Sequence, residues 1–113
     1  MGYEISKSDW KLFRTKLADW QEAYMGKLTR EYIEILSTDE KNSEKFRKLD
    51  ERIRKDKKSP GVQISPKKSN VIYDLLEMIE DGVIDQGDLT DFSEDLQETV
   101  GFLVERRYGG SVD

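Results

Sequence analysis

Five aspartates recur through the C-terminal third of the sequence, and closely spaced carboxylates are the usual ligands of calcium and magnesium ions. The five are Asp81, Asp85, Asp88, Asp91 and Asp95. An EF-hand loop with Gly82 in sixth place needs an oxygen-bearing side chain third and a glutamate twelfth, where Ile79 and Asp88 stand. No companion motif marks a carboxylate pair for acid–base catalysis. We therefore expect helix caps and solvated surface, with no metal, cofactor or catalytic residue.

A second group is basic and lies in residues 52–68, hereafter the basic segment. Its Ser65-Pro66 pair is typical of a helix start, where free N–H groups attract anions. No aromatic residue separates the lysines and no glycine-rich phosphate loop is present. Two interpretations stay open: a docking surface for an acidic partner, or solvated surface. The candidate partner-binding residues are Arg54, Lys55, Lys57, Lys58, Lys67 and Lys68.

Charge is distributed unevenly along the 113 residues, whose formal net charge is −5. Residues 1–40 hold six basic and eight acidic side chains (−2), residues 41–70 hold eleven and four (+7), and residues 71–113 hold two and twelve (−10). This alternation favours either docking of the middle of the chain on its own C-terminal third, or separate faces for two partners.

Residue types that are missing exclude several classes of protein. The chain has no histidine and no cysteine, so the commonest general base, the commonest zinc ligand and any disulfide are excluded. No apolar run approaches the roughly 20 residues that span a bilayer, and the first ten residues lack the apolar region of a signal peptide. We expect a cytoplasmic protein that is not an enzyme.

Apolar spacing predicts an all-α single domain over residues 1–113, a small bundle of about five helices with a flexible tail at 107–113. A short first helix is expected to be interrupted near Asp19, and Gly82 suits a left-handed position after the fourth. Residues 62–64 and 83–84 are candidates for a brief two-stranded pairing. The predicted helix caps are Ser6, Asp19, Ser43, Ser65, Asp85 and Ser93.

The predicted core collects the apolar stripes of these helices. Its members are Trp20, Tyr24, Leu28, Ile35, Phe46, Leu49, Ile53, Leu75, Leu76, Ile79, Phe92, Leu96 and Leu103.

Three stretches carry a resemblance to known proteins: "DWQEAYMGKLTREYIEILS", "RIRKDKKSPGVQI" and "DGVIDQGDLTDFSEDLQETV". They resemble a group of small uncharacterised helical proteins of low-GC Gram-positive bacteria and their mobile elements, which often carry the label "multidrug transporter". We reject that label for this chain because no segment is long and apolar enough to cross a membrane. The resemblance implies a recurring small domain and assigns no role to any residue.

Three functions remain open. We expect a protein-interaction or regulatory module that uses a charge-polarised helical surface, with an acidic surface on the partner protein. Nucleic-acid binding through the basic segment is the first alternative, whereas reading of DNA by the last helix is disfavoured because Glu94, Asp95 and Glu98 would meet phosphates of the same sign. The second alternative is an acidic inhibitor of a nucleic-acid-processing defence enzyme. The sequence leaves the oligomeric state open.

Overall fold

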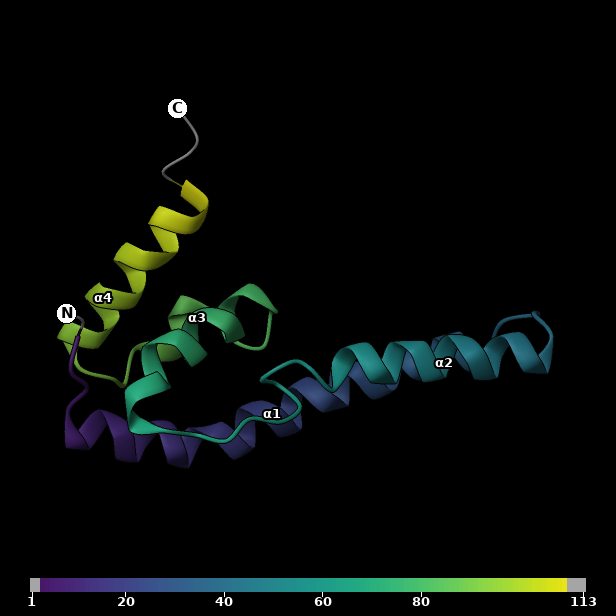
Figure 1. The fold of residues 1–113 in the computed structure, drawn as a ribbon, viewed down its shortest axis with the longest axis horizontal. Helices are drawn as coiled ribbons and strands as arrows, with labels where there is room; N and C mark the ends of the chain where they lie inside the picture. The colour runs from purple at the N-terminus through teal and green to yellow at the C-terminus, as the bar shows by residue number, and fades with distance from the viewer. Residues whose placement is uncertain (1–2, 110–113) are drawn as a thin grey trace.

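The computed structural model describes residues 3–109, and Figure 1 shows a helical lobe from which one helix pair projects. The α-helices in the described residues are α1 (Lys7–Leu36), α2 (Asn42–Asp56), α3 (Val71–Glu80) and α4 (Glu94–Val104). The all-α prediction is confirmed, with four α-helices in place of about five. The predicted pairing of residues 62–64 with 83–84 is wrong, since residues 3–109 contain no strand.

Short turns complete the chain. Two 3₁₀ turns, Lys68–Asn70 and Gln86–Leu89, precede α3 and α4, and a π-helical turn, Glu105–Gly109, extends α4. The predicted flexible tail therefore begins inside that turn, and its residues 110–113 lie outside the described residues.

Helix α1 is one continuous helix of 30 residues, so the predicted interruption at Asp19 is wrong. Ser6 caps its start by accepting the backbone N–H of Asp9 at 3.1 Å. Asp19 is exposed on the side of the helix, where its carboxylate has no free helix end to cap. The first half of α1 packs in the lobe and the second half packs against α2 (Figure 1).

Two more predicted caps, Asp85 and Ser93, are confirmed, and so is the left-handed glycine. Asp85 and Asp88 form a reciprocal capping box at the second 3₁₀ turn, with N–H to carboxylate distances of 2.9 and 3.2 Å. The Ser93 hydroxyl accepts the N–H of Leu96 at 3.2 Å and starts α4. Gly82 has a φ of 77°, in the left-handed region that glycine enters without steric cost, and ends α3 as expected.

Besides Asp19, two predicted caps are wrong. Ser43 lies inside α2, which begins one residue earlier, after an N-cap residue that makes no side-chain hydrogen bond. Ser65 and Pro66 remain in extended chain, and helical structure begins only at Lys68. The capping signatures were present at both places, but the two helical segments begin after Lys41 and Lys67.

The core lies where the first half of α1 meets α3 and α4. Of the predicted core, Leu28, Leu75, Leu76, Phe92 and Leu96 are buried, and most other members are half-buried. Phe46 is 76% exposed and does not belong to the core. The reason is tertiary: α2 packs on one helix only, so the far side of its apolar stripe stays open. The largest fully buried side chains are Phe13, Leu75, Met78, Leu89, Leu96, Val71 and Val100.

A polar clamp ties the start of α1 to the start of α4. The Asp9 side chain is buried, and its two carboxylate oxygens accept the N–H of Ser93 at 3.0 Å and the Ser93 hydroxyl at 2.6 Å. These two residues are 84 positions apart in sequence. The clamp fixes where α4 begins relative to α1, and with it the position of α4 beside α3.

Candidate functional site

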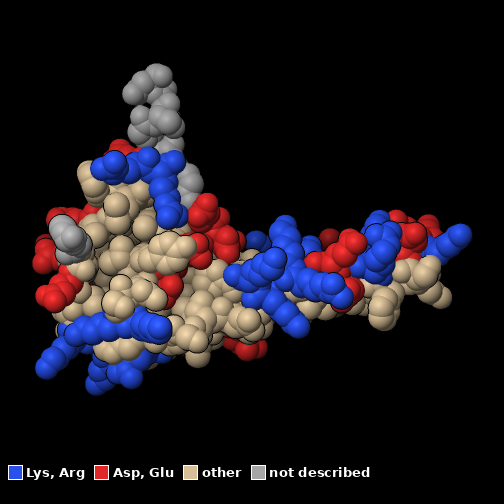
Figure 2. All heavy atoms as spheres, in the orientation of Figure 1, with Lys and Arg blue, Asp and Glu red and all other residues tan. Residues whose placement is uncertain are grey.

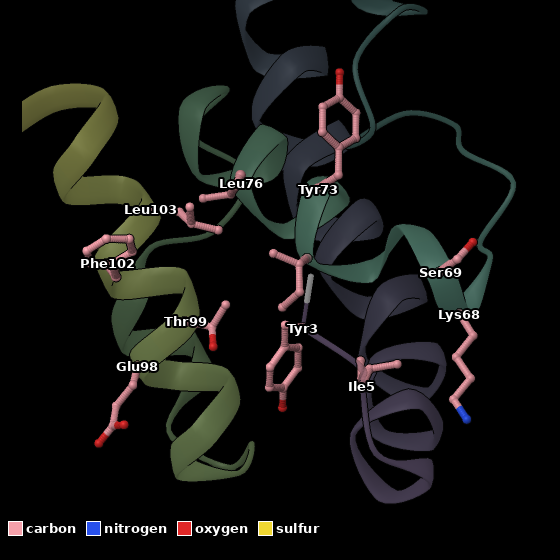
Figure 3. Close-up of a pocket in the computed structure, with 11 residues that line it drawn as sticks. Tyr3, Ile5, Lys68, Ser69, Tyr73, Leu76, Glu98, Thr99, Phe102 and Leu103 are labelled. Carbon is pink, nitrogen blue, oxygen red and sulfur yellow. The ribbon is translucent and has the colours of Figure 1, made fainter. Parts of the chain in front are cut away.

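An apolar groove of about 670 Å³ lies between α3 and α4, beside residues 3–5 (Figure 3). This volume is within the range of sites that hold a ligand or a short peptide segment, roughly 300–1,000 Å³. The apolar and aromatic residues along it are Tyr3, Ile5, Ile72, Tyr73, Leu76, Phe102 and Leu103. We call it the α3–α4 groove.

The groove exists because α3 is apolar on more than one side. Val71, Leu75 and Met78 face the core and are fully buried. Ile72 and Leu76, four residues apart on a neighbouring side of the helix, line the groove. A helix with a single apolar stripe would have placed polar side chains there, so the groove wall is a property of the α3 sequence.

Two aromatic side chains on this groove are exposed to solvent. The exposed fraction is 55% for Tyr73 and 60% for Phe102. Large exposed aromatic residues beside a groove are typical of protein-binding surfaces. The Tyr73 hydroxyl donates to Glu77 at 3.0 Å, a hydrogen bond that raises the pKa of Tyr73.

One lysine lines the α3–α4 groove, and two arginines follow α4. Lys68 lies at the end formed by the start of α3 (Figure 3). At the other end, an ion pair of 3.1 Å between Arg107 and Glu80 shows that the C-terminal ends of α3 and α4 lie together, and Arg106 stands 5.8 Å from the ring of Phe102. Glu98 on α4 supplies one negative charge between these ends.

The six candidate residues of the basic segment do not form one surface. Lys55 and Lys58 line a polar hollow beside Tyr24, about halfway along α1. Lys68 instead lies in the α3–α4 groove with Ile5, at the start of α1. At roughly 1.5 Å per residue of helix, these two places are about 25 Å apart.

The remaining three candidates fall into the same two groups. Arg54, on α2, is exposed and pairs with Asp50 at 3.1 Å. Lys57, just after α2, borders a small apolar groove between α1 and α2. Lys67 precedes Lys68 and is exposed. The structure thus divides the basic segment into a group at residues 54–58 and a pair at residues 67–68.

Turns and irregular chain at residues 59–66 separate the two groups, and this connection is held against α1. Gln21 donates to the Pro60 carbonyl at 2.9 Å, and the Ser59 hydroxyl donates to Asp81 at 2.8 Å. Gly61 packs so closely on the Tyr24 ring that a Cβ atom there would collide with it and would stand 2.6 Å from the Cγ2 atom of Val83. The segment is therefore a packed connection and not a free loop.

A buried carboxylate at the end of α2 links this helix to α1. Asp56 accepts the Tyr32 hydroxyl at 2.6 Å and pairs with Arg52 at 3.0 Å. Arg52 also pairs with Glu31 on α1. Burial, followed by the hydrogen bond to Asp56, raises the pKa of Tyr32 to about 12. Every group in this cluster has a partner, which is the arrangement of a structural link between α1 and α2.

The five aspartates of the C-terminal third form structural contacts or lie in solvent. Asp81 accepts Ser59, Asp85 and Asp88 cap each other's turn, and Asp91 pairs with Lys16 at 3.1 Å. Within residues 3–109, no cluster of three or more acidic, histidine or cysteine side chains is placed to hold a metal ion.

The C-terminal third meets the basic segment at the polar hollow, where Glu77 and Asp81 line the same space as Lys55 and Lys58. Of the ion pairs among the described residues, none joins residues 54–68 to an acidic side chain of residues 71–107. The polar contact between the two regions is the hydrogen bond from Ser59 to Asp81.

Sequence reasoning missed the α3–α4 groove, although two signals pointed to it. The stretch "VIYDLLEMI" holds more apolar residues than one helix stripe needs, and Phe102 interrupts the polar side of α4. None of the described helices combines the length and the apolar character that crossing a membrane requires. Searches against protein-family models, curated proteins and solved structures found no match to this chain.

Proposed function

We propose that this protein is a non-enzymatic protein-interaction module, and that the α3–α4 groove holds an apolar segment of a partner protein with acidic residues at both ends. The observation that carries the proposal is the groove itself, with its two exposed aromatic side chains, Tyr73 and Phe102. A helix with apolar residues at positions i, i+3, i+4 and i+7 is the usual occupant of such a groove.

Charge selects the class of partner. Lys68 at one end and Arg106, beside Phe102, at the other would meet acidic residues that flank the apolar segment, whereas Arg107 is already paired with Glu80. The proposed partner is still acidic, as expected from the sequence. Its acidic residues would contact Lys67 and Lys68, and not residues 54–58. We propose the cytoplasm as the place of action, because a chain without cysteine shows no sign of an oxidising compartment.

A peptide-display selection tests the proposal without knowledge of the natural partner. Random 16-residue peptides are selected on the wild-type protein and then compared on two variants, Phe102→Glu and Phe46→Glu. Both variants place a charge at an exposed phenylalanine, but only Phe102 lies in the α3–α4 groove. We expect enriched peptides to carry an apolar row with acidic flanks, to lose binding to Phe102→Glu, and to keep binding to Phe46→Glu.

Two results would contradict the proposal: a selection without any peptide that needs Phe102, or one enriched in basic peptides. The main alternative is tested with a fluorescent 20-base-pair DNA duplex at physiological salt. Binding of that duplex, lost in the double variant Lys67→Glu/Lys68→Glu, would favour nucleic acid as the partner.

A further inference from the structure

The first half of α1 carries an exposed basic side that a count of charge along the chain conceals. Lys7, Lys11 and Arg14 recur at intervals of four and three residues, and all three are exposed. At about 100° per residue, their positions fall within an arc of about 60° around the helix. Residues 1–40 together have a charge of −2, so only the helix shows that three positive charges share one side.

Two contacts place the acidic start of α4 on the opposite side of α1. Asp9 accepts both hydrogen bonds from Ser93, and Lys16 pairs with Asp91 at 3.1 Å. Positions 9 and 16 lie about 160° and 180° around the helix from position 7. The acidic first turn of α4 is therefore separated from the basic side by the body of α1.

Three exposed acidic side chains border the basic side at its ends. Glu4 precedes the helix, and Asp19 and Glu22 follow Arg14 by five and eight residues, or about 7.5 and 12 Å along the axis. Of the ion pairs among residues 3–109, none involves the three cations of this side. Their charge is therefore not neutralised by a contact within the described chain.

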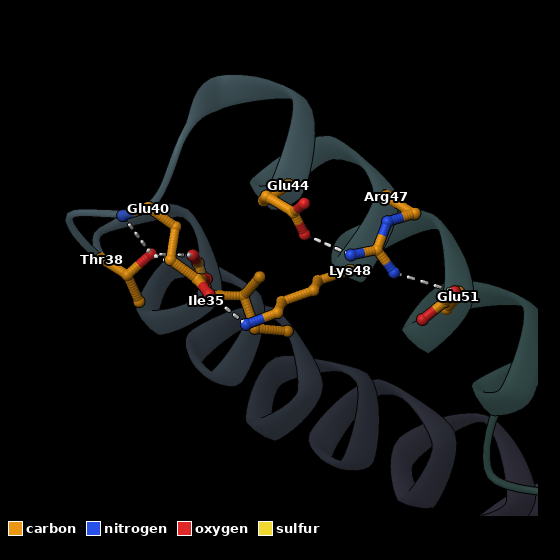
Figure 4. A network of polar contacts seen from close by, with 7 residues as sticks. All are labelled: Ile35, Thr38, Glu40, Glu44, Arg47, Lys48 and Glu51. Carbon is orange, nitrogen blue, oxygen red and sulfur yellow. Dashed lines mark hydrogen bonds and ion pairs between the residues drawn. The ribbon is translucent and has the colours of Figure 1, made fainter.

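Several cations of α2 are arranged differently. Arg47 pairs with Glu44 and, at 3.4 Å, with Glu51, and Lys48 pairs with Glu40 (Figure 4). The fields of two paired charges largely cancel a few ångströms away, so such cations attract an anion less than unpaired ones do. The basic side of α1 is thus the better candidate for an anionic ligand.

A second segment brings two more cations to the same end of α1. Lys68 lines the α3–α4 groove together with Ile5, just before α1 begins (Figure 3), and Lys67 precedes it. The connection from α2 reaches this place along α1, where Gln21 binds the Pro60 carbonyl. Figure 2 shows Lys and Arg gathered along the lower edge of the lobe, where Figure 1 places the first half of α1. We call this surface the α1 basic face, and its cations are Lys7, Lys11, Arg14, Lys67 and Lys68.

The α1 basic face lacks an exposed apolar centre. The large hydrophobic side chains that are exposed in residues 3–109 lie on the second half of α1 and on α2, α3 and α4. Trp10 is half-buried, with Phe13 stacked at 6.3 Å and the Arg14 guanidinium 5.0 Å from its ring. Protein interfaces have an apolar core, and membrane-surface helices insert apolar side chains. A strongly positive, polar surface instead is typical of nucleic-acid binding.

We propose that the α1 basic face binds the phosphate backbone of double-stranded DNA without reading its sequence. The three cations of α1 span about 10 Å of helix, a length over which a duplex presents about six phosphates. Phosphate contacts position a protein on DNA and carry no information about the bases. The proposal does not rest on peptide binding in the α3–α4 groove, with which the face shares only Lys68.

Fluorescence anisotropy of a labelled 20-base-pair duplex, titrated with the full chain at about 0.05–0.15 M salt, tests the proposal. Three to five phosphate contacts predict a slope of about −3 to −4.5 for the logarithm of the binding constant against that of salt. The variant Lys11→Glu/Arg14→Glu should bind at least tenfold more weakly, with a slope smaller in magnitude by about 2. Lys67 and Lys68 stay unchanged because Lys68 also lines the groove.

The matched control is Lys27→Glu/Arg30→Glu. It changes the same two residue types, three positions apart, at exposed sites of the same helix, but about 140–160° around the helix from position 7. This control, Lys57→Glu/Lys58→Glu and Phe102→Glu should each keep duplex binding within threefold of wild type. Far-ultraviolet circular dichroism checks that every variant keeps its helices, and a second duplex of unrelated sequence should bind equally well.

Four results would overturn the proposal. They are no duplex binding at about 100 μM protein and 0.05 M salt, binding that Lys11→Glu/Arg14→Glu leaves intact, an equal loss in the matched control, or a tenfold preference between the two duplexes. Vesicles of phosphatidylserine and phosphatidylcholine test the remaining polyanionic surface. Vesicle binding that needs Lys11 and Arg14, in a protein that does not bind the duplex, would assign the face to a membrane.

Discussion

Replacing Asp9 with alanine should loosen the joint between α1 and α4 and destabilise the whole lobe. The Asp9 side chain is 3% exposed and accepts two hydrogen bonds from Ser93, at 3.0 and 2.6 Å. A hydrogen bond to a charged group contributes about 1.5–3 kcal/mol. Part of that sum is offset because the variant no longer buries a carboxylate, so we expect a loss of about 3 kcal/mol. For a chain of this size that is a fall in Tm of about 12 °C.

Thermal and urea denaturation followed by circular dichroism measure this loss. The matched control is Asp19→Ala, which removes an exposed carboxylate from the same helix and should change the free energy of unfolding by less than about 0.5 kcal/mol. A double-mutant cycle with Ser93→Ala should give a coupling energy of about 1–3 kcal/mol, because the two side chains bond each other directly. A Tm for Asp9→Ala within 2 °C of wild type, or additive effects of the two substitutions, would refute the clamp.

Three further predictions concern the rest of the fold. Tyr32→Phe removes the hydroxyl that donates to buried Asp56 and should lower the free energy of unfolding by about 1–2 kcal/mol in urea; an unchanged urea midpoint would contradict this. Burial raises the pKa of Asp74 from 3.8 to about 6, so the folded protein holds a proton that the unfolded chain has lost, and stability falls as pH rises from about 4 to 6. Asp74→Asn should therefore raise Tm at pH 7.5 by a few degrees and leave it unchanged at pH 3.5. A gain of equal size at both pH values would show that the raised pKa of Asp74 is not the cause. Gly61→Ala should cost about 1–3 kcal/mol by overpacking, whereas Gly26→Ala, where a methyl group has room, should not destabilise the fold; equal effects at the two glycines would show that the chain at residue 61 is not tightly packed.

Local features of the sequence were sufficient for the fold class and for several helix ends. The caps at Ser6, Asp85 and Ser93 and the left-handed Gly82 each depend on contacts within three or four residues. Such contacts depend on neighbours in the sequence, so a spacing rule can find them. The prediction failed at Ser43 and Ser65, where the same signature occurs but the helical segment begins at another residue.

Contacts between distant residues could not be found in this way. Sequence spacing assigned Ser93 to one helix start and nothing in it connected that residue to Asp9, which only the tertiary structure joins to Ser93 in one clamp. Phe46 belongs to a regular apolar stripe, yet it is exposed because no third helix covers α2. Spacing shows that a residue is on an apolar side of its helix, but it does not show whether another element packs there.

The basic segment shows the same division between local pattern and tertiary placement. Composition alone determined that residues 41–70 carry the positive charge of an acidic protein. Whether that charge forms one surface depended on the path of residues 59–67, which the packing of Gly61 on Tyr24 and the hydrogen bond from Gln21 to Pro60 hold against α1. Charge is a property of the side chains and can be counted, whereas the distance between charges is set by contacts between segments far apart in the sequence.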